Sequence, residues 1–166
     1  MDRDTNSAKN YQIVTYCSAR AKEIIDLFYL AVHSIDPNIY SVAQQYAWAP
    51  TPINYQKWFD RLSNKRPFLL LINDKVAGFM ELESDGHIDC AYVHPDYQQQ
   101  GVATHLLLHL VMCAKQSKIP ALYVEASIIA KPLFQKLGFK VIKSQTVNRN
   151  NEALIQYLMQ KQLVLS

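Results

Sequence analysis

The middle of the chain reads Val93-His94-Pro95-Asp96-Tyr97-Gln98-Gln99-Gln100-Gly101-Val102-Ala103-Thr104. An apolar run ends there, because Pro95 has no N–H group with which to continue a strand. We expect a helix to begin next, and the backbone N–H groups of its first turn have no partners inside the helix. Gly101 has no side chain, so a ligand can approach the backbone closely. Such a helix start attracts anions, and a pyrophosphate is the ligand we expect.

The pattern Gln98-x-x-Gly101-x-Ala103, placed directly after a strand that ends at a proline, resembles the acyl-CoA-binding motif of the GNAT acetyltransferase superfamily. In that family these amides hold the pyrophosphate of acetyl-CoA. Residues 124–127 (Val-Glu-Ala-Ser) and 130–139 (Ala-Lys-Pro-Leu-Phe-Gln-Lys-Leu-Gly-Phe) resemble the later motif of the family. Both motifs occur in the expected order, and the resemblance covers almost the whole chain.

The hydrophobic periodicity predicts alternating strands and helices along the chain. Strands are predicted at about 11–16, 68–72, 76–82, 87–93, 121–124, 139–147 and 153–159, and helices at about 18–32, 40–48, 53–62, 100–115 and 131–137. Ser18 is a plausible N-cap for the first helix. The helix at 100–115 is apolar on nearly all sides, which predicts that it is buried. This order predicts an α/β (α+β) domain whose mixed, mostly antiparallel central sheet is flanked by helices, as in the GNAT fold.

Length and composition indicate one soluble globular domain spanning residues 1–166, with residues 1–9 expected to be flexible. The formal net charge of +3, without a dense Lys/Arg run, argues against a nucleic-acid partner. No apolar stretch reaches the length of a membrane span, and the polar N-terminus is not a signal peptide. We expect the three cysteines to be buried, reduced thiols, which suggests a cytoplasmic location.

The resemblance implies acetyl-CoA as co-substrate, with no metal. The pyrophosphate loop would consist of Gln98, Gln99, Gln100, Gly101, Val102, Ala103 and Thr104. Backbone groups of Tyr92 and Val93 would pair with the pantetheine arm. Phe134 stands where many members have a tyrosine that protonates the leaving thiolate, and a phenyl ring cannot donate that proton. We expect Phe134 to pack against the coenzyme instead.

Acetylation of an amine requires a base, because an alkylammonium with a pKa near ~10.4 must lose a proton before it can attack. The resemblance points to His87, at the strand position where several members have a catalytic carboxylate. Asp89 shares its strand face and would tune its pKa. Glu81 and Glu83 on the neighbouring strand are rival bases, and a water chain ending on any of these groups is equally compatible with the sequence. Ser127 or water could serve as the acid instead, and Tyr123 is a weaker candidate.

Aromatic residues precede the predicted sheet, in the segment that forms one wall of the acceptor site in the family. Tyr40, Tyr46 and Trp48 could hold an apolar or cationic amine against their ring faces, or could be ordinary core residues. His105 and His109 have the spacing of a metal site but lack a third ligand, so we expect no metal there.

The leading hypothesis is an N-acetyltransferase that moves an acetyl group directly from acetyl-CoA to a primary amine of a small molecule or peptide. The alternative is a CoA-ester-binding sensor with little turnover, which the phenylalanine at position 134 favours. Members of the family are often homodimers, and the sequence leaves both the oligomeric state and the acceptor open.

Overall fold

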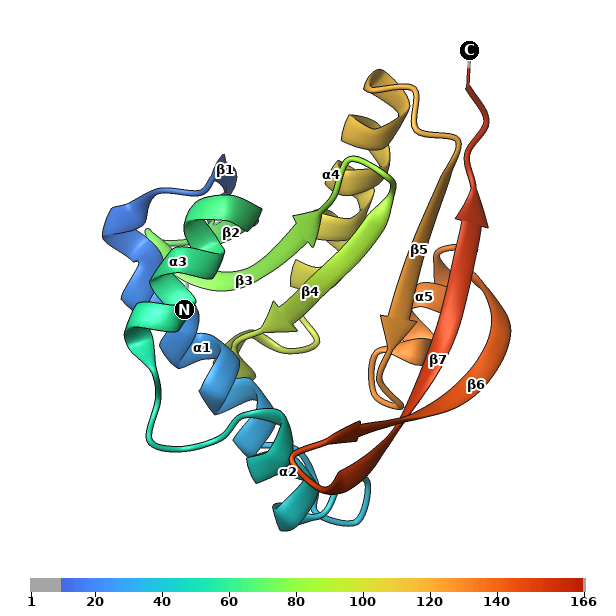
Figure 1. Cartoon of the computed structure of the whole chain (residues 1–166). Helices are drawn as coiled ribbons and strands as arrows, with labels where there is room; N and C mark the ends of the chain where they lie inside the picture. The colour runs from blue at the N-terminus through green and yellow to red at the C-terminus, as the bar shows by residue number, and fades with distance from the viewer. Residues whose placement is uncertain (1–9, 166) are drawn as a thin grey trace, which may run out of the picture.

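The computed structural model describes residues 10–165, so the expectation for residues 1–9 concerns a segment outside the described residues. Within this range one sheet has the strand order β1-β2-β3-β4-β5-β7-β6 (Figure 1). The strands are β1 (Tyr11–Thr15), β2 (Phe68–Ile72), β3 (Lys75–Leu82), β4 (His87–Val93), β5 (Ala121–Ala126), β6 (Lys140–Arg149) and β7 (Glu152–Gln162). All neighbours are antiparallel except β4 and β5. The mixed, mostly antiparallel sheet confirms the predicted fold class.

The helices also lie close to their predicted positions. They are α1 (Ala21–His33), α2 (Val42–Trp48), α3 (Tyr55–Lys65), α4 (Val102–Gln116) and α5 (Lys131–Lys136). Ser18 opens a short 3-10 turn rather than capping α1, so this helix begins later than predicted. At the start of α2, the Ser41 hydroxyl accepts a hydrogen bond from the backbone of Gln44, and the Gln44 side chain accepts one from the backbone of Ser41.

Helices cover both faces of the sheet around β2 and β3. Leu70 and Met80 pack with α4 and α5 on one face, whereas Leu69 and Phe79 pack with α1 and α3 on the other. Alternate strand residues face opposite sides, so β2 and β3 each contribute to both cores. Gly78 lets α4 lie close to β3, because a Cβ at this position would be 2.7 Å from a methyl group of α4.

Two burial expectations from the sequence are wrong. Leu108 and Met112 of α4 are 54% and 47% exposed, since the sheet covers only one face of this helix. Among the cysteines only Cys90 is buried, while Cys17 is exposed and Cys113 is intermediate. In residues 10–165, no helix combines the length and the apolar character needed to cross a membrane.

The sheet opens between β4 and β5. These parallel strands pair only at His87 with Tyr123 and at Ile88 with Val124. Figure 1 shows the two strands diverging beyond this contact, with their C-terminal ends far apart. The C-terminal half of β4 therefore has β3 as its partner on one side and no strand on the side that faces β5.

A β-bulge lies next to this opening. The pairing of β3 with β4 shifts between Met80 and Leu82, so Asp89 and Cys90 together stand opposite the single residue Glu81. An extra residue in one strand reverses the alternation of side chains beyond it. This bulge decides which side chains of β4 reach the opening.

The burial pattern of β4 shows the reversal. Ile88, before the bulge, packs in the core on the α4 side, whereas Tyr92 packs on the α1 side. Strict alternation would have put these two residues, four positions apart, on the same face. Because of the bulge, Tyr92 shares its face with His87 and Asp89.

Candidate active site

A cavity of about 560 Å³ opens where β4 and β5 diverge, and we call it the loop cavity. Nine of the ten residues that the sequence assigned to coenzyme binding line it: Tyr92, Val93, Gln98, Gln99, Gly101, Val102, Ala103, Thr104 and Phe134. The structure therefore brings both predicted motifs to one place. Apolar residues of the segment that joins α1 to α2, such as Ile35 and Ile39, complete its lining. The sequence carried no signal for these, because the segment matches no motif.

Gln100 is the one predicted loop residue that does not line the loop cavity. Its side-chain amide donates to the backbone carbonyl of Asp96 at 3.2 Å, and its backbone carbonyl accepts from the Tyr11 hydroxyl at 3.4 Å. These contacts hold the loop in position from outside.

The start of α4 has the geometry that an anion site requires. Gly101 occupies the N-cap position in a left-handed conformation, with φ of 80°, and no side chain caps the helix. The first-turn amides therefore have neither helical partners nor a capping side chain, and they lie along the loop cavity.

A second cavity of about 320 Å³, the hairpin cavity, lies between β4, β5 and the β6–β7 hairpin. Its lining consists of Tyr40, Trp48, His87, Asp89, Tyr92, Glu125, Ser127, Gln145, Val147, Arg149, Leu154, Ile155 and Gln156. Trp48, Tyr92 and Ser127 line both cavities, and we call them the neck. Trp48 donates its indole hydrogen to the Tyr92 hydroxyl at 3.0 Å, which fixes two of these side chains.

His87 lies in the hairpin cavity beside a carboxylate of β5. Its Nε2 is 2.6 Å from Oε2 of Glu125, and its Nδ1 is 3.6 Å from Oε1 of Glu83. The ring stacks on Tyr123, with centroids 4.8 Å apart. Burial favours the neutral ring, but the hydrogen bond and charge of Glu125, helped by Asp89 and Glu83, outweigh it and raise the pKa of His87 above its usual value.

Asp89, the second predicted catalytic group on β4, is held by cations from α3. Its carboxylate lies 3.0 Å from Arg61 and 3.0 Å from Lys65. Burial opposes ionisation, but the contacts with Lys65 and Arg61 outweigh it and keep the pKa of Asp89 below its usual value. Asp89 is therefore a fixed negative charge in the wall of the hairpin cavity rather than a free base.

Glu81 lies away from both cavities. Its side chain is fully buried and accepts a bidentate pair of hydrogen bonds from Arg61. Burial raises the pKa of Glu81, and the guanidinium only partly offsets this effect. This position argues against the predicted role of Glu81 as a base. Both of its carboxylate oxygens accept hydrogen bonds from Arg61, and its side chain lines neither the loop cavity nor the hairpin cavity.

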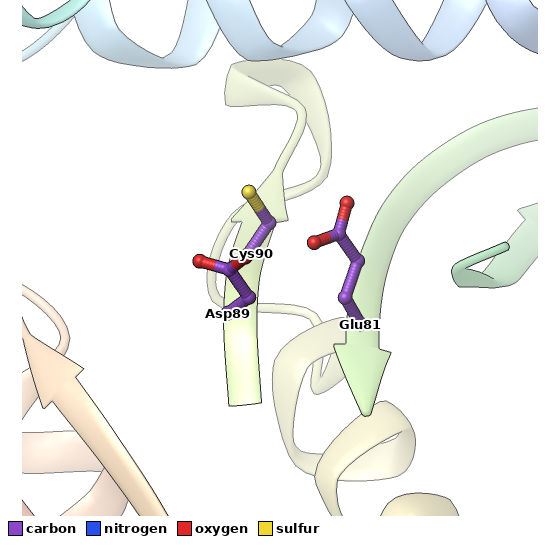
Figure 2. Close-up of side chains that lie close together, drawn as sticks. All are labelled: Glu81, Asp89 and Cys90. Atoms are coloured by element: carbon purple, nitrogen blue, oxygen red, sulfur yellow. The ribbon is translucent and has the colours of Figure 1, made fainter. Parts of the chain in front are cut away.

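The same cations argue against a metal. In Figure 2, Glu81 of β3 lies beside Asp89 and Cys90 of β4, with ligand atoms within 4.8 Å of one another. The bulge produces this cluster by placing two residues opposite one. Arg61 binds both carboxylates of the cluster. Lys65 likewise binds the carboxylates of the overlapping group around His87. Both acidic groups thus have a cation from the chain itself, and we assign no metal to them.

The three aromatic residues that were predicted to bind the acceptor do not all line one cavity in the structure. Tyr40 and Trp48 line the hairpin cavity, but Tyr46 is 50% exposed, packs against His33 and lines neither cavity. Tyr40 is buried, and its hydroxyl donates to the Ile155 carbonyl and accepts from the Ile128 amide, both at 2.9 Å. Tyr40 thereby ties the β5–α5 connection to the hairpin.

Ser127 stands at the neck with its hydroxyl hydrogen available. The Oγ atom accepts a hydrogen bond from the amide of Ala130 at 3.1 Å. Among residues 10–165 no acceptor is found for the hydroxyl hydrogen, which can therefore be donated to a ligand. Phe134, at the usual tyrosine position, is 1% exposed and offers only its ring to the loop cavity.

Four polar residues that line the hairpin cavity were not predicted as site residues from the sequence. Glu125 belongs to the later motif, Gln145 and Gln156 fall in the predicted strands at 139–147 and 153–159, and Arg149 falls between these strands, so no sequence pattern marks them as site residues. The hairpin reaches the site because it bends towards α2 (Figure 1), where Asn150 donates to the Ala47 carbonyl at 2.8 Å. No local pattern in the sequence encodes that contact.

Comparison with known proteins identifies the family. Residues 38–161 match the acetyltransferase (GNAT) domain. The chain is 33% identical over 138 residues to the uncharacterized N-acetyltransferase YafP of Escherichia coli (strain K12), covering 83% of this chain and 87% of that protein. The chain therefore belongs to the GNAT acetyltransferase family.

Solved structures agree with this assignment. A GCN5-related N-acetyltransferase from Rhodopseudomonas palustris superposes with a TM-score of 0.86 at 31% identity, covering 92% of this chain and 95% of that one. The PaiA N-acetyltransferase from Thermoplasma acidophilum, solved in complex with coenzyme A, superposes with a TM-score of 0.72. It is 16% identical over 92% of this chain and 99% of that one, and at this identity the likeness shows the fold alone.

Proposed function

We propose that this protein transfers an acetyl group from acetyl-CoA, held in the loop cavity, to an amine held in the hairpin cavity. The observation that carries this proposal is the neck, where Trp48, Tyr92 and Ser127 line both cavities. A thioester that enters from one side and an amine that enters from the other would meet there. Holding both reactants in a productive geometry supplies much of the rate gain in such reactions, roughly 7–11 kcal/mol in the best cases.

The lining of the loop cavity suits the pyrophosphate and the pantetheine arm of the coenzyme. First-turn amides from Val102 to Thr104 would bind the pyrophosphate, and the left-handed Gly101 leaves the backbone open to it. The apolar side chains between α1 and α5 would cover the pantetheine arm. The PaiA enzyme, which shares the fold, was solved with coenzyme A bound, and this supports the same use of the fold here.

His87 would act as the base. A carboxylate can only accept a hydrogen bond, so Glu125 keeps the hydrogen of the neutral ring on Nε2. The lone pair of Nδ1, which lies 3.6 Å from Oε1 of Glu83, can then take up a proton. The ammonium of the acceptor loses one proton through water to His87. Its nitrogen then bonds to the thioester carbonyl carbon as the carbon–sulfur bond breaks. The second proton leaves the nitrogen and is gained by the sulfur, so that the products are the amide and the free thiol.

Ser127 would stabilise the leaving sulfur in place of the tyrosine that this chain lacks. Its hydroxyl hydrogen has no acceptor within residues 10–165 and lies at the neck. A thiol has a pKa near ~8.5, so the thiolate needs only modest assistance as it departs. Phe134 would contribute packing alone.

The test is release of free thiol from acetyl-CoA in the presence of a panel of primary amines. The wild-type protein should release thiol only when an amine is present, and His87→Gln should lower kcat by about 10²- to 10⁴-fold. Tyr46→Phe, outside both cavities, is the matched control and should retain full activity. Acetyl-CoA binding without turnover of any amine would instead support the CoA-ester sensor that Phe134 favours.

A further inference from the structure

The hairpin cavity contains one cationic side chain that has no anionic partner. Arg149, the last residue of β6, is the single lysine or arginine in its lining. Its cross-strand neighbour is Glu152, but no carboxylate of residues 10–165 forms an ion pair with the guanidinium. The positive charge of Arg149 also acts on Tyr92 at the neck. Burial raises the pKa of Tyr92, and the charge of Arg149 partly opposes this rise.

The carboxylates that line this cavity, in contrast, already have partners within the protein. Asp89 is held by Arg61 and Lys65 of α3, and Glu125 is held by His87. These acidic groups lie on β4 and β5, whereas Arg149 projects from the hairpin. A ligand that carried only a positive charge would add a cation to a cavity whose carboxylates already have cationic partners. A ligand that also carried a carboxylate would give Arg149 the anionic partner that it lacks in the protein.

The neighbouring side chains suit the same ligand. Gln145 and Gln156 stand opposite each other on the hairpin, and the Gln145 amide lies 3.5 Å from the Gln156 carbonyl. This long contact leaves amide hydrogens available to carboxylate oxygens. Val147, Leu154 and Ile155 give the cavity an apolar part. A volume of about 320 Å³ admits a small molecule rather than a folded protein surface.

We propose that the acceptor is a small amine that also bears a carboxylate, of the amino-acid class, and that Arg149 recognises this carboxylate. The proposal rests on the acetyl transfer proposed above. The planar guanidinium can bind a carboxylate through two parallel hydrogen bonds. The ammonium end would then lie towards Asp89, Glu125 and the neck, where it loses its proton.

The experiment compares matched acceptors. The common amino acids and β-alanine are each assayed beside the corresponding carboxamide, with release of thiol from acetyl-CoA as the readout. The amide of an amino acid has the more acidic ammonium, so simple chemical reactivity favours the amides. A higher kcat/KM for the acids would therefore reflect recognition of the carboxylate.

Arg149→Gln keeps a hydrogen-bonding side chain but removes the charge. We expect this variant to lower kcat/KM for carboxylate-bearing acceptors by about 10- to 100-fold, chiefly through KM, and to leave the carboxamides unchanged. Lys143→Gln removes one exposed positive charge from the same strand outside the cavity, and it should change neither class. Melting curves of both variants should match that of the wild type, because each side chain is exposed.

The outcomes separate the two proposals. If acids and amides are acetylated equally and Arg149→Gln changes neither, carboxylate recognition is overturned while acetyl transfer stands. If the acids are preferred and only this preference disappears in Arg149→Gln, both proposals are supported. If none of these acceptors releases thiol but another primary amine does, carboxylate recognition is overturned while acetyl transfer stands. If no primary amine releases thiol, both proposals fail.

Discussion

Nε2 of His87 lies 2.6 Å from Oε2 of Glu125, although the two residues are 38 positions apart in the chain. The contact exists because β4 and β5 are parallel at this one place before they diverge. It places an imidazole and its carboxylate partner at the mouth of the opening in the sheet. The protonation of His87, the base in the proposed function, therefore depends on a residue from another strand, and that dependence can be measured.

Glu125→Gln should move the acid limb of the pH–rate profile to lower pH. Only the neutral imidazole can take up a proton, so kcat/KM rises with pH through the pKa of His87. Glu125 holds that pKa above its usual value, and removing the charge lowers it. The measurement is kcat/KM against pH for one fixed acceptor. Glu152→Gln, which alters a carboxylate outside the cavities, should leave the profile of the wild type unchanged.

The same profile can contradict the assignment. If the wild type and Glu125→Gln have the same inflection on the acid side, or if His87→Gln retains that inflection, the group that titrates is not His87. Asp89 would not explain such a result, because its pKa lies below that of a free aspartate.

Tyr40→Phe should reduce the free energy of unfolding by about 1–3 kcal/mol, the usual cost of leaving buried polar groups without a partner. The change removes the bridge between the Ile128 amide and the Ile155 carbonyl. Denaturant unfolding provides the measurement. Tyr46→Phe alters a tyrosine that is half exposed, and it should cost almost nothing. Equal losses in the two variants would contradict the assigned role of Tyr40.

Arg61→Met should destabilise the fold by about 3–5 kcal/mol, because it leaves the carboxylate of Glu81 buried without its partner. The double variant Arg61→Met with Glu81→Gln should recover part of that loss. Lys22→Met breaks the exposed pair with Asp26 and should cost less than about 1 kcal/mol. Urea unfolding of the four proteins tests whether Glu81 serves the fold, and a mild effect of Arg61→Met would reopen its role as a base.

Local signals explain what the sequence predicted well. The turn at Asn73-Asp74 has positive φ at both residues, as does the turn at Asn150-Asn151, and each joins two strands that were predicted. The loop before α4 was predicted with the same success, because Pro95 and Gly101 constrain the backbone directly. Such features depend on a few neighbouring residues, so they can be read from a short window.

The features that the sequence did not reveal depend on register and on distant contacts. A single extra residue at Asp89-Cys90 puts Tyr92 on the same face as His87 and Asp89, and no composition signal marks that bulge. Trp48 and Tyr46 lie two positions apart on α2, yet only Trp48 reaches the neck, since the two side chains point in different directions from the helix. Arg149 reaches the hairpin cavity only because the hairpin bends onto α2.

The most direct test of the central claim is a calorimetric titration of the protein with acetyl-CoA. The wild type should bind one equivalent in the micromolar range, with free CoA competing. Ala103→Asp places a carboxylate beside the expected pyrophosphate and should abolish binding, although an acidic residue in the first turn favours the helix itself. Leu108→Asp adds the same charge on the exposed face of α4 and should bind as the wild type does. Absence of binding heat from the wild type across a range of temperatures, or equal binding by Ala103→Asp, would contradict the assignment of the coenzyme to this loop.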